Sequence, residues 1–329
     1  ATRPDHTLRY VLFYESADDV ASKAPLHMDR WACEQPPKAA IMLAHGLAEH
    51  AGRYARLGAE LAANGFALFA LDQRGHGKTA QQGVIGQFAE QDGWQKVVGD
   101  LASLNHHIRH LHPALPIYLL GHSMGSYIGQ AYLMQHSCSL QGAILCGSNF
   151  QSAALYRSAG LIARLERWRL GPNGRSRLLN YLSFGSFNNA FKPVKTDFDW
   201  LSRDPEEVDR YVNDPLCGFI ATTQLWIDLL GGLATISATK ALSQIDPGLP
   251  LLVIGGDCDP VSAGKRLNDL AGALKVAGLK NVELKTYPGA RHELLNESNR
   301  AEVTAYLITW LDKALAFRRM LQPACKEKP

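Results

Sequence analysis

Length, composition and charge narrow the classes of protein to which this chain can belong. Its 329 residues, 46% of them hydrophobic, can bury a full core as one large domain or as a domain with an inserted subdomain. The 34 basic and 31 acidic side chains give a formal net charge of +3, which excludes the strong basic excess of a typical nucleic-acid-binding protein. No apolar stretch approaches the ~20 residues that a membrane-spanning helix requires.

The cysteine content favours a reducing compartment. The chain has no Cys-x-x-Cys pair and no zinc-type spacing of cysteine and histidine, so we expect reduced thiols, no metal and a cytoplasmic location. The first ten residues, ATRPDHTLRY, lack the apolar segment of a signal peptide, although a chain that begins without Met could already be processed. The six cysteines are Cys33, Cys138, Cys146, Cys217, Cys258 and Cys325.

Short apolar runs alternate with helical stretches along most of the chain. This pattern is typical of a mostly parallel sheet whose strands are joined by crossover helices. It predicts an α/β protein with a central sheet flanked by helices. The expected strands span residues 39–44, 67–71, 117–120, 142–146, 249–254 and 282–287, and the expected helices span 54–63, 94–110, 124–135, 263–277 and 300–317.

The alternation stops between residues 150 and 240, where no strand-like run occurs. We interpret this stretch as an inserted helical cap, so that the core is formed by residues 1–149 and 241–329. The cap holds 12 of the 28 aromatic residues, including Trp200 and Trp226. These could form an apolar wall for an acyl chain or the core of a small subdomain, so no single substrate-binding residue is predicted within 150–240.

The strongest motif is Gly-His-Ser-Met-Gly at residues 121–125, which follows an expected strand and opens an expected helix. A serine in such a tight strand-to-helix turn has an exposed hydroxyl, and the small residues two positions away on either side permit the sharp turn. The start of the helix also favours negative charge that develops nearby. The motif therefore predicts Ser123 as a nucleophile.

A serine hydroxyl is a poor nucleophile at neutral pH, so it needs a base and a carboxylate that orients the base. His292 follows the expected strand 282–287, and two acids, Asp257 and Asp259, follow the expected strand 249–254. The chain order Ser, Asp, His is the one found with this serine motif. We favour Asp259 because Pro260 would stiffen its loop, and Asp257 is the alternative.

Acyl transfer also requires hydrogen-bond donors for the oxyanion of the tetrahedral intermediate. One donor is usually the backbone N–H after the nucleophile, which here belongs to Met124. The other usually comes from the loop after an earlier strand, and Leu47 in the segment AHGLAEH is the natural candidate. We expect His45 and Gly46 to shape this loop.

Three further patterns have simpler interpretations than catalysis. The glycine-rich turn DQRGHG at residues 72–77 lacks the glycine and lysine spacing of a phosphate-binding loop. We interpret it as a structural turn near the site. His106 and His110 lie four apart on an expected helix, but without a completed H-E-x-x-H motif a solvated face is the better interpretation. Five arginines around Trp168 could meet a membrane surface or form an ordinary solvated face: Arg164, Arg167, Arg169, Arg175 and Arg177.

With these motifs identified, the sequence resembles the monoacylglycerol lipase and lysophospholipase group of α/β-hydrolases. The resemblance covers residues 39–148 and 249–316 and rests on the segments AHGLAEHAGRY, ALDQRGHGKT, GHSMGS, GGDCDPV and YPGARHELLNE. It departs from the family at Lys78-Thr79, where a serine is common at the second position. The resemblance implies the α/β-hydrolase fold with Ser123, Asp259 and His292 as the triad and Leu47 and Met124 as oxyanion donors.

We therefore expect an enzyme that hydrolyses carboxylic esters of single-acyl lipids, either monoacylglycerols or lysophospholipids, through an acyl-enzyme on Ser123. No metal or organic cofactor is implied. The expected partners are the small lipid ester and, transiently, a membrane or micelle surface at the cap; the oligomeric state is left open. The alternatives are a short-chain carboxylesterase, a proline-type aminopeptidase that recruits Glu206 or Glu207, and a ligand receptor on an inactive hydrolase scaffold.

Overall fold

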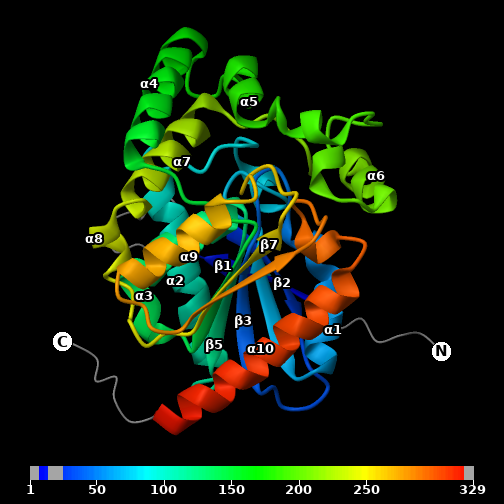
Figure 1. Cartoon of the computed structure of the whole chain (residues 1–329), viewed down its shortest axis with the longest axis vertical. Coiled ribbons are helices and arrows are strands. Elements are labelled where there is room, and N and C mark those ends of the chain that lie inside the picture. Colours follow the sequence, from blue (N-terminus) through cyan, green and yellow to red (C-terminus); the bar gives the residue numbers. More distant parts are fainter. Residues whose placement is uncertain (1–6, 14–24, 322–329) are drawn as a thin grey trace.

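The computed structural model of the protein describes residues 7–13 and 25–321. Within these ranges the centre of the molecule is an eight-stranded sheet (Figure 1) with the strand order β1-β2-β4-β3-β5-β6-β7-β8. Strands β3 to β8 run parallel, and β2 is antiparallel to both of its neighbours. The strands are β1 (Thr7–Phe13), β2 (Pro25–Trp31), β3 (Ala39–Ala44), β4 (Phe66–Leu71), β5 (Ile117–His122), β6 (Gly142–Cys146), β7 (Leu251–Gly256) and β8 (Val282–Tyr287).

Helices cover both faces of the sheet because the central parallel strands are apolar on both sides. Met42 and Leu119 point into a core that includes residues of α2, α3 and α9, whereas Ile41 and Leu68 point into a second core with α1 and α10. This mostly parallel, helix-flanked sheet confirms the predicted fold class. The flanking helices are α1 (Ala55–Ala63), α2 (Gly93–Leu111), α3 (Met124–His136), α9 (Arg266–Val276) and α10 (Arg300–Leu321).

Between β6 and β7 the chain forms helices and no strand, and most of this segment lies beyond one end of the sheet (Figure 1). Helix α4 packs on α7, which in turn packs on α2 and α3 of the core. We call residues 150–240 the cap; its status as a separate subdomain stays a prediction. Its helices are α4 (Ala153–Leu170), α5 (Arg177–Phe184), α6 (Pro205–Asn213) and α7 (Thr223–Ile236), and the short α8 (Thr239–Leu242) crosses its C-terminal boundary.

Two boundaries differ from the sequence prediction for clear physical reasons. The strand expected at 249–254 begins at Leu251, because Pro250 has no N–H for the sheet ladder. The helix expected at 263–277 begins at Arg266, because Ala263 and Gly264 have φ angles of 44° and 66°, which an α-helix does not accommodate.

Two general properties of the described residues bear on the environment of the protein. None of their helices combines the length and the apolar character needed to cross a bilayer. None of the five described cysteines is in a disulfide, and Cys325 lies outside the described residues. The cytoplasmic location inferred from cysteine content stays a prediction.

Candidate active site

Ser123 occupies a strained turn between β5 and α3. Its φ and ψ angles are 51° and −120°, a conformation that non-glycine residues rarely adopt and that is typical of functional sites. The turn is possible because its flanking residues are glycines. A Cβ atom on Gly121 would lie 2.6 Å from the carbonyl oxygen of Gly125, and one on Gly125 would collide with the carbonyl group of Ala44.

His292 and Asp259 are brought together by the loops that follow β8 and β7. The Nδ1 atom of His292 lies 3.0 Å from each carboxylate oxygen of Asp259, and both side chains are buried. The neighbouring Asp257 is exposed and accepts instead from the backbone N–H of Gly289, at 2.6 Å. Of the two acids considered from sequence, Asp259 is the one in contact with the histidine.

Ser123 lies on the loop next to this pair. Its backbone N–H donates to the carbonyl oxygen of Cys146 at 2.9 Å, and a Cβ atom on the following Gly147 would lie 3.3 Å from His292 Cε1. No hydrogen bond joins the Ser123 hydroxyl to His292 in the described part of the chain. Such catalytic hydrogen bonds are often long in ligand-free proteins and shorten when substrate binds.

The two expected oxyanion donors lie on segments that meet at Ser123. A Cβ atom on Gly46 would lie 3.3 Å from Ser123 Cβ, so the loop at residues 45–50, called the oxyanion loop below, adjoins the serine. Among the described residues, neither the N–H of Leu47 nor that of Met124 has a hydrogen-bond acceptor. Met124 opens α3, where unpaired N–H groups are expected. Both groups are therefore available to bind a developing negative charge.

His45 shapes the oxyanion loop as a buried, neutral imidazole. Its Nδ1–H donates to the carbonyl oxygen of Gly46 at 2.8 Å, while its Nε2 accepts from the backbone N–H of Gln73 at 3.0 Å. Burial lowers the pKa of His45, which agrees with the neutral tautomer that these two partners require. The glycine-rich turn at residues 72–77 thus supports the oxyanion loop through Gln73.

Comparison with known proteins identifies the family of the chain. The family model of the serine aminopeptidases, S33, matches residues 35–299. The chain belongs to this family. A monoacylglycerol lipase of Mycolicibacterium smegmatis is 32% identical, covering 86% of this chain and 91% of that protein. A monoglyceride lipase of Rattus norvegicus is 30% identical, covering 87% and 86%. These matches confirm the resemblance to the monoacylglycerol lipase group.

The fold of this S33 family member is also similar to those of solved structures. A thermostable carboxyl esterase from Bacillus coagulans, in complex with glycerol, has a TM-score of 0.85 at 26% identity and covers 93% of this chain and 99% of that one. A lipase in its open form has a TM-score of 0.80 at 25% identity, with 94% and 99% coverage. The likeness confirms the α/β-hydrolase fold.

A buried ion-pair network, which the sequence reasoning missed, joins the oxyanion loop to the His292 loop. Arg53 donates to Glu293 at 2.5 and 2.8 Å and to Glu49 at 2.9 Å. Glu49 also accepts from the backbone N–H of Gly46 at 2.6 Å. Glu49 lies in the oxyanion loop and Glu293 directly follows His292, so Arg53 connects two loops that are distant in sequence. Glu49 within AHGLAEH and Glu293 within RHE are the sequence signals that could have indicated this network.

His122, the residue before Ser123, links this network to the histidine. Its Nδ1 lies 3.2 Å from Glu49 Oε1 and its Nε2 lies 3.3 Å from the carbonyl oxygen of His292, so both nitrogens face acceptors. An imidazole that donates at both nitrogens is protonated. Burial lowers the pKa of His122, but the hydrogen bond and charge of Glu49 outweigh burial, and the pKa is raised. His122 thus contacts the backbone of the candidate base.

Aromatic side chains of the cap lie against His292. The ring centroid of Trp200 is 5.1 Å from that of His292, and Phe187 packs edge-on against Trp200 at 5.0 Å. The backbone N–H of Glu293 donates to the carbonyl oxygen of Leu201 at 2.7 Å. The cap therefore supplies both an apolar contact and a backbone hydrogen bond to the loop that bears the histidine.

The remaining residues singled out from sequence lie outside this arrangement. His106 and His110 are exposed on α2. Among the cap arginines, Arg169 pairs with Glu166 at 2.7 Å, while Arg164 and Arg167 are exposed. In the described part of the chain, a different group has the composition to hold a metal ion: His50, Asp214 and Cys217.

Proposed function

We propose that the chain hydrolyses carboxylic esters of single-acyl lipids, monoacylglycerols or lysophospholipids, with Ser123 as nucleophile, His292 as base and Asp259 as the acid that orients the base. The observation that carries the proposal is the buried Asp259–His292 pair beside a serine in a strained strand-to-helix turn. The relatives that are named monoacylglycerol lipases support a carboxylic-ester hydrolase that acts on lipid esters.

The reaction follows from the roles of these groups. His292 Nε2 accepts the Ser123 proton while Oγ bonds to the ester carbonyl carbon, and the resulting oxyanion accepts from Leu47 and Met124. The carbon–oxygen bond to the glycerol or headgroup alcohol then breaks, and His292 returns the proton to that alcohol. A water molecule, deprotonated by His292, then bonds to the acyl carbon, the bond to Ser123 Oγ breaks, and His292 returns the proton to Oγ as the fatty acid leaves. Asp259 keeps the Nδ1 proton in place throughout, so that Nε2 stays basic.

Substrate profiling tests this function. A methylene group buried in an apolar pocket contributes about 0.8 kcal/mol, so burial of only about two of the additional methylenes of a lauroyl chain raises kcat/KM for monoacylglycerols by about tenfold over a butyryl chain, and burial of more raises it further. Parallel assays with lysophosphatidylcholine and p-nitrophenyl esters separate headgroup preference from chain preference. A maximum at short chains would favour a carboxylesterase instead.

The aminopeptidase alternative receives less support from the cap. Glu206 and Glu207 both face Arg210, at 3.5 and 2.5 Å, so neither is left as an unopposed carboxylate for a substrate amino group. Cleavage of aminoacyl amides without cleavage of lipid esters would reverse this preference.

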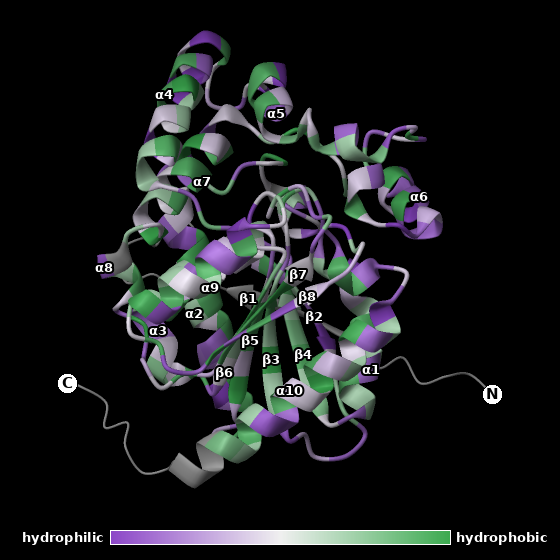
Figure 2. Ribbon diagram, in the orientation of Figure 1, coloured by the Kyte–Doolittle hydropathy of each residue, from purple (hydrophilic) through white to green (hydrophobic). Residues whose placement is uncertain are grey.

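We also propose that the cap contacts lipid surfaces through the outer faces of α4 and α5. Hydrophobic residues lie along both helices at the upper end of Figure 2. Leu165 is 66% exposed and Trp168 is 87% exposed, and Leu161, Tyr181 and Leu182 are also exposed. An exposed apolar patch that is flanked by arginines suits an interface of acyl chains and anionic headgroups.

Replacement of Leu161, Leu165 and Trp168 together by serine is expected to weaken binding to phosphatidylglycerol-containing vesicles by about tenfold or more, because each exposed apolar side chain loses burial in the interface. Vesicle sedimentation measures the effect. The control is Val276→Ser, which removes a 79% exposed apolar side chain from the end of α9 and should not change binding. Equal binding by the triple variant and the wild type would contradict the proposal.

A further inference from the structure

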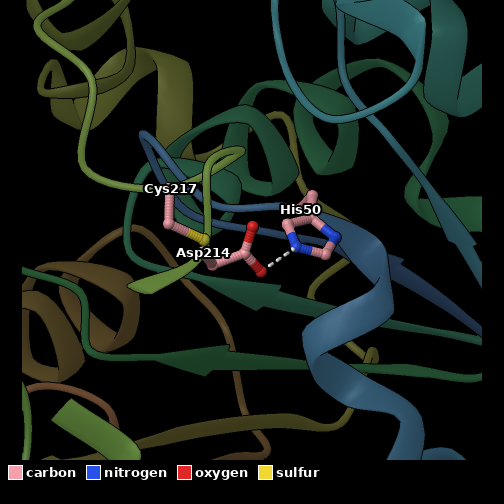
Figure 3. A group of neighbouring side chains, drawn as sticks. All are labelled: His50, Asp214 and Cys217. Atoms are coloured by element: carbon pink, nitrogen blue, oxygen red, sulfur yellow. Dashed lines mark hydrogen bonds and ion pairs between the residues drawn. The ribbon is translucent and has the colours of Figure 1, made fainter. Parts of the chain in front are cut away.

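Three side chains from two distant segments converge beside the oxyanion loop (Figure 3). His50 ends that loop, and Asp214 and Cys217 come from the cap segment that follows α6. Their potential ligand atoms all lie within 4.8 Å of one another, and His50 Nε2 is 2.9 Å from Asp214 Oδ2. We propose that His50, Asp214 and Cys217 bind a transition-metal ion such as Zn²⁺, and that the bound ion inhibits hydrolysis by holding the cap against the oxyanion loop.

The donor set suits zinc. Imidazole nitrogen, carboxylate oxygen and thiolate sulfur are the protein ligands of Zn²⁺, and three of them leave a fourth tetrahedral position for water. With metal–ligand bonds of about 2.0–2.3 Å, neighbouring ligands of a tetrahedral ion lie roughly 3.3–3.7 Å apart. The His50–Asp214 pair therefore needs to open slightly, while the Cys217 sulfur already lies within 4.8 Å of both ligand atoms. All three residues are only half-buried, which permits such small side-chain movements.

The surroundings have the charge and the access that a cation needs. Cys217 lies within electrostatic range of three carboxylates, those of Asp214, Glu49 and Glu293, and of one guanidinium, that of Arg53. Glu49 and Glu293 are already paired with Arg53 and His122, so Asp214 is the carboxylate that remains to balance part of the charge of a bound cation. His50 and Asp214 also line an open surface cleft of about 970 Å³, which provides an entry path from solvent.

Binding replaces an existing hydrogen bond. In the structure His50 Nδ1 accepts from the backbone N–H of Gly52 at 3.2 Å, so Nε2 carries the proton and donates to Asp214 at 2.9 Å. Coordination through Nε2 moves that proton to Nδ1, and the contact with Gly52 is lost. The Cys217 thiol releases its proton to solvent and binds the ion as a thiolate. Two hydrogen bonds of His50, with Gly52 and Asp214, are thus replaced by three metal–ligand bonds.

The position of the cluster connects it to activity. The carbonyl oxygen of Ala48, one residue after Leu47, accepts from the backbone N–H of Gly218 and from the Tyr211 hydroxyl, each at 2.9 Å. The cap thus already contacts the oxyanion loop beside Cys217 through two bonds that can separate. A metal ion that bridges His50 to Asp214 and Cys217 makes the same contact much harder to open. The inhibition, unlike the binding, rests on the proposed function.

Binding is tested first, without reference to activity. The full chain, treated with chelator and then titrated with Co²⁺, is expected to develop a thiolate-to-cobalt charge-transfer absorption that Zn²⁺ abolishes. Cys217→Ser and Cys217→Ala should both lose this band, while Cys138→Ser, which alters an exposed cysteine after α3, should keep it. Thermal unfolding of each variant verifies that it is folded. A wild-type protein without the band, or a band that persists in both folded Cys217 variants, would overturn the site.

Inhibition is tested second, with a soluble ester. We expect Zn²⁺ to inhibit the wild type and Cys138→Ser reversibly, with EDTA restoring activity, and we expect Cys217→Ser, His50→Gln and Asp214→Asn each to require about 10-fold or more Zn²⁺ for the same fractional inhibition. Equal zinc sensitivity of Cys217→Ser and wild type would place the inhibitory ion elsewhere, for example on His292, and overturn the inhibitory role. A chain without esterase activity would refute the proposed function, while the cobalt titration would still decide the metal site.

Discussion

Replacement of Ser123 by alanine is expected to lower kcat for a monoacylglycerol by about 10⁴-fold or more, because no other hydroxyl is held in the strained turn next to His292. The His292→Ala variant should lose a similar amount, and the double variant should lose little more, since triad members act as a unit. The residual rate would come from substrate binding and from the N–H groups of Leu47 and Met124.

Steady-state kinetics and covalent labelling with a fluorophosphonate probe measure this effect independently. The probe should label the wild type and Ser243→Ala, a control that removes an exposed hydroxyl outside the site, and should not label Ser123→Ala. Labelling of Ser123→Ala would point to another nucleophile. An unlabelled wild-type protein would favour a receptor built on an inactive hydrolase scaffold.

The Asp259→Asn substitution is expected to lower kcat by about 10⁴-fold, whereas Asp257→Asn should change it only a few-fold. The asparagine amide can donate to His292 Nδ1, which would leave the proton on Nε2 and prevent that nitrogen from accepting the Ser123 proton. Asp257 is exposed and contacts the backbone of Gly289, so its charge serves the loop and not the imidazole.

The two asparagine variants form a matched pair, because they make the same chemical change two residues apart. Comparison of their kcat values, together with thermal unfolding to verify folding, decides which acid orients the base. Equal losses of kcat, or a larger loss for Asp257→Asn, would contradict the assignment of this role to Asp259.

The sheet was predictable where its strands are buried on both faces. Strands such as β3 (AAIMLA) and β4 (FALFAL) are continuous apolar runs, as expected for the middle of a parallel sheet. Strand β2 (PLHMDRW) was missed because apolar and polar residues alternate along most of it, which is the pattern of an antiparallel strand with one side less buried.

Only the site residues that lie in short sequence motifs could be predicted from the sequence. The serine turn and the His292 loop each follow an apolar run and contain recognisable residues, so their positions could be inferred from short segments. The Arg53–Glu293 pair joins residues 240 positions apart, and the contacts of His122 depend on how two loops meet after folding. Such pairings are set by the relative positions of loops, which no local pattern encodes.

The cap leaves the core from β6 and returns to it at β7, and these two strands are hydrogen-bonded neighbours. Both ends of the insertion are therefore fixed by the same sheet, and its length can change at a conformational-entropy cost that grows only logarithmically. Related proteins with this sheet can therefore differ in the whole inserted segment. Their substrate specificity can change in this way while the catalytic residues of the core stay the same.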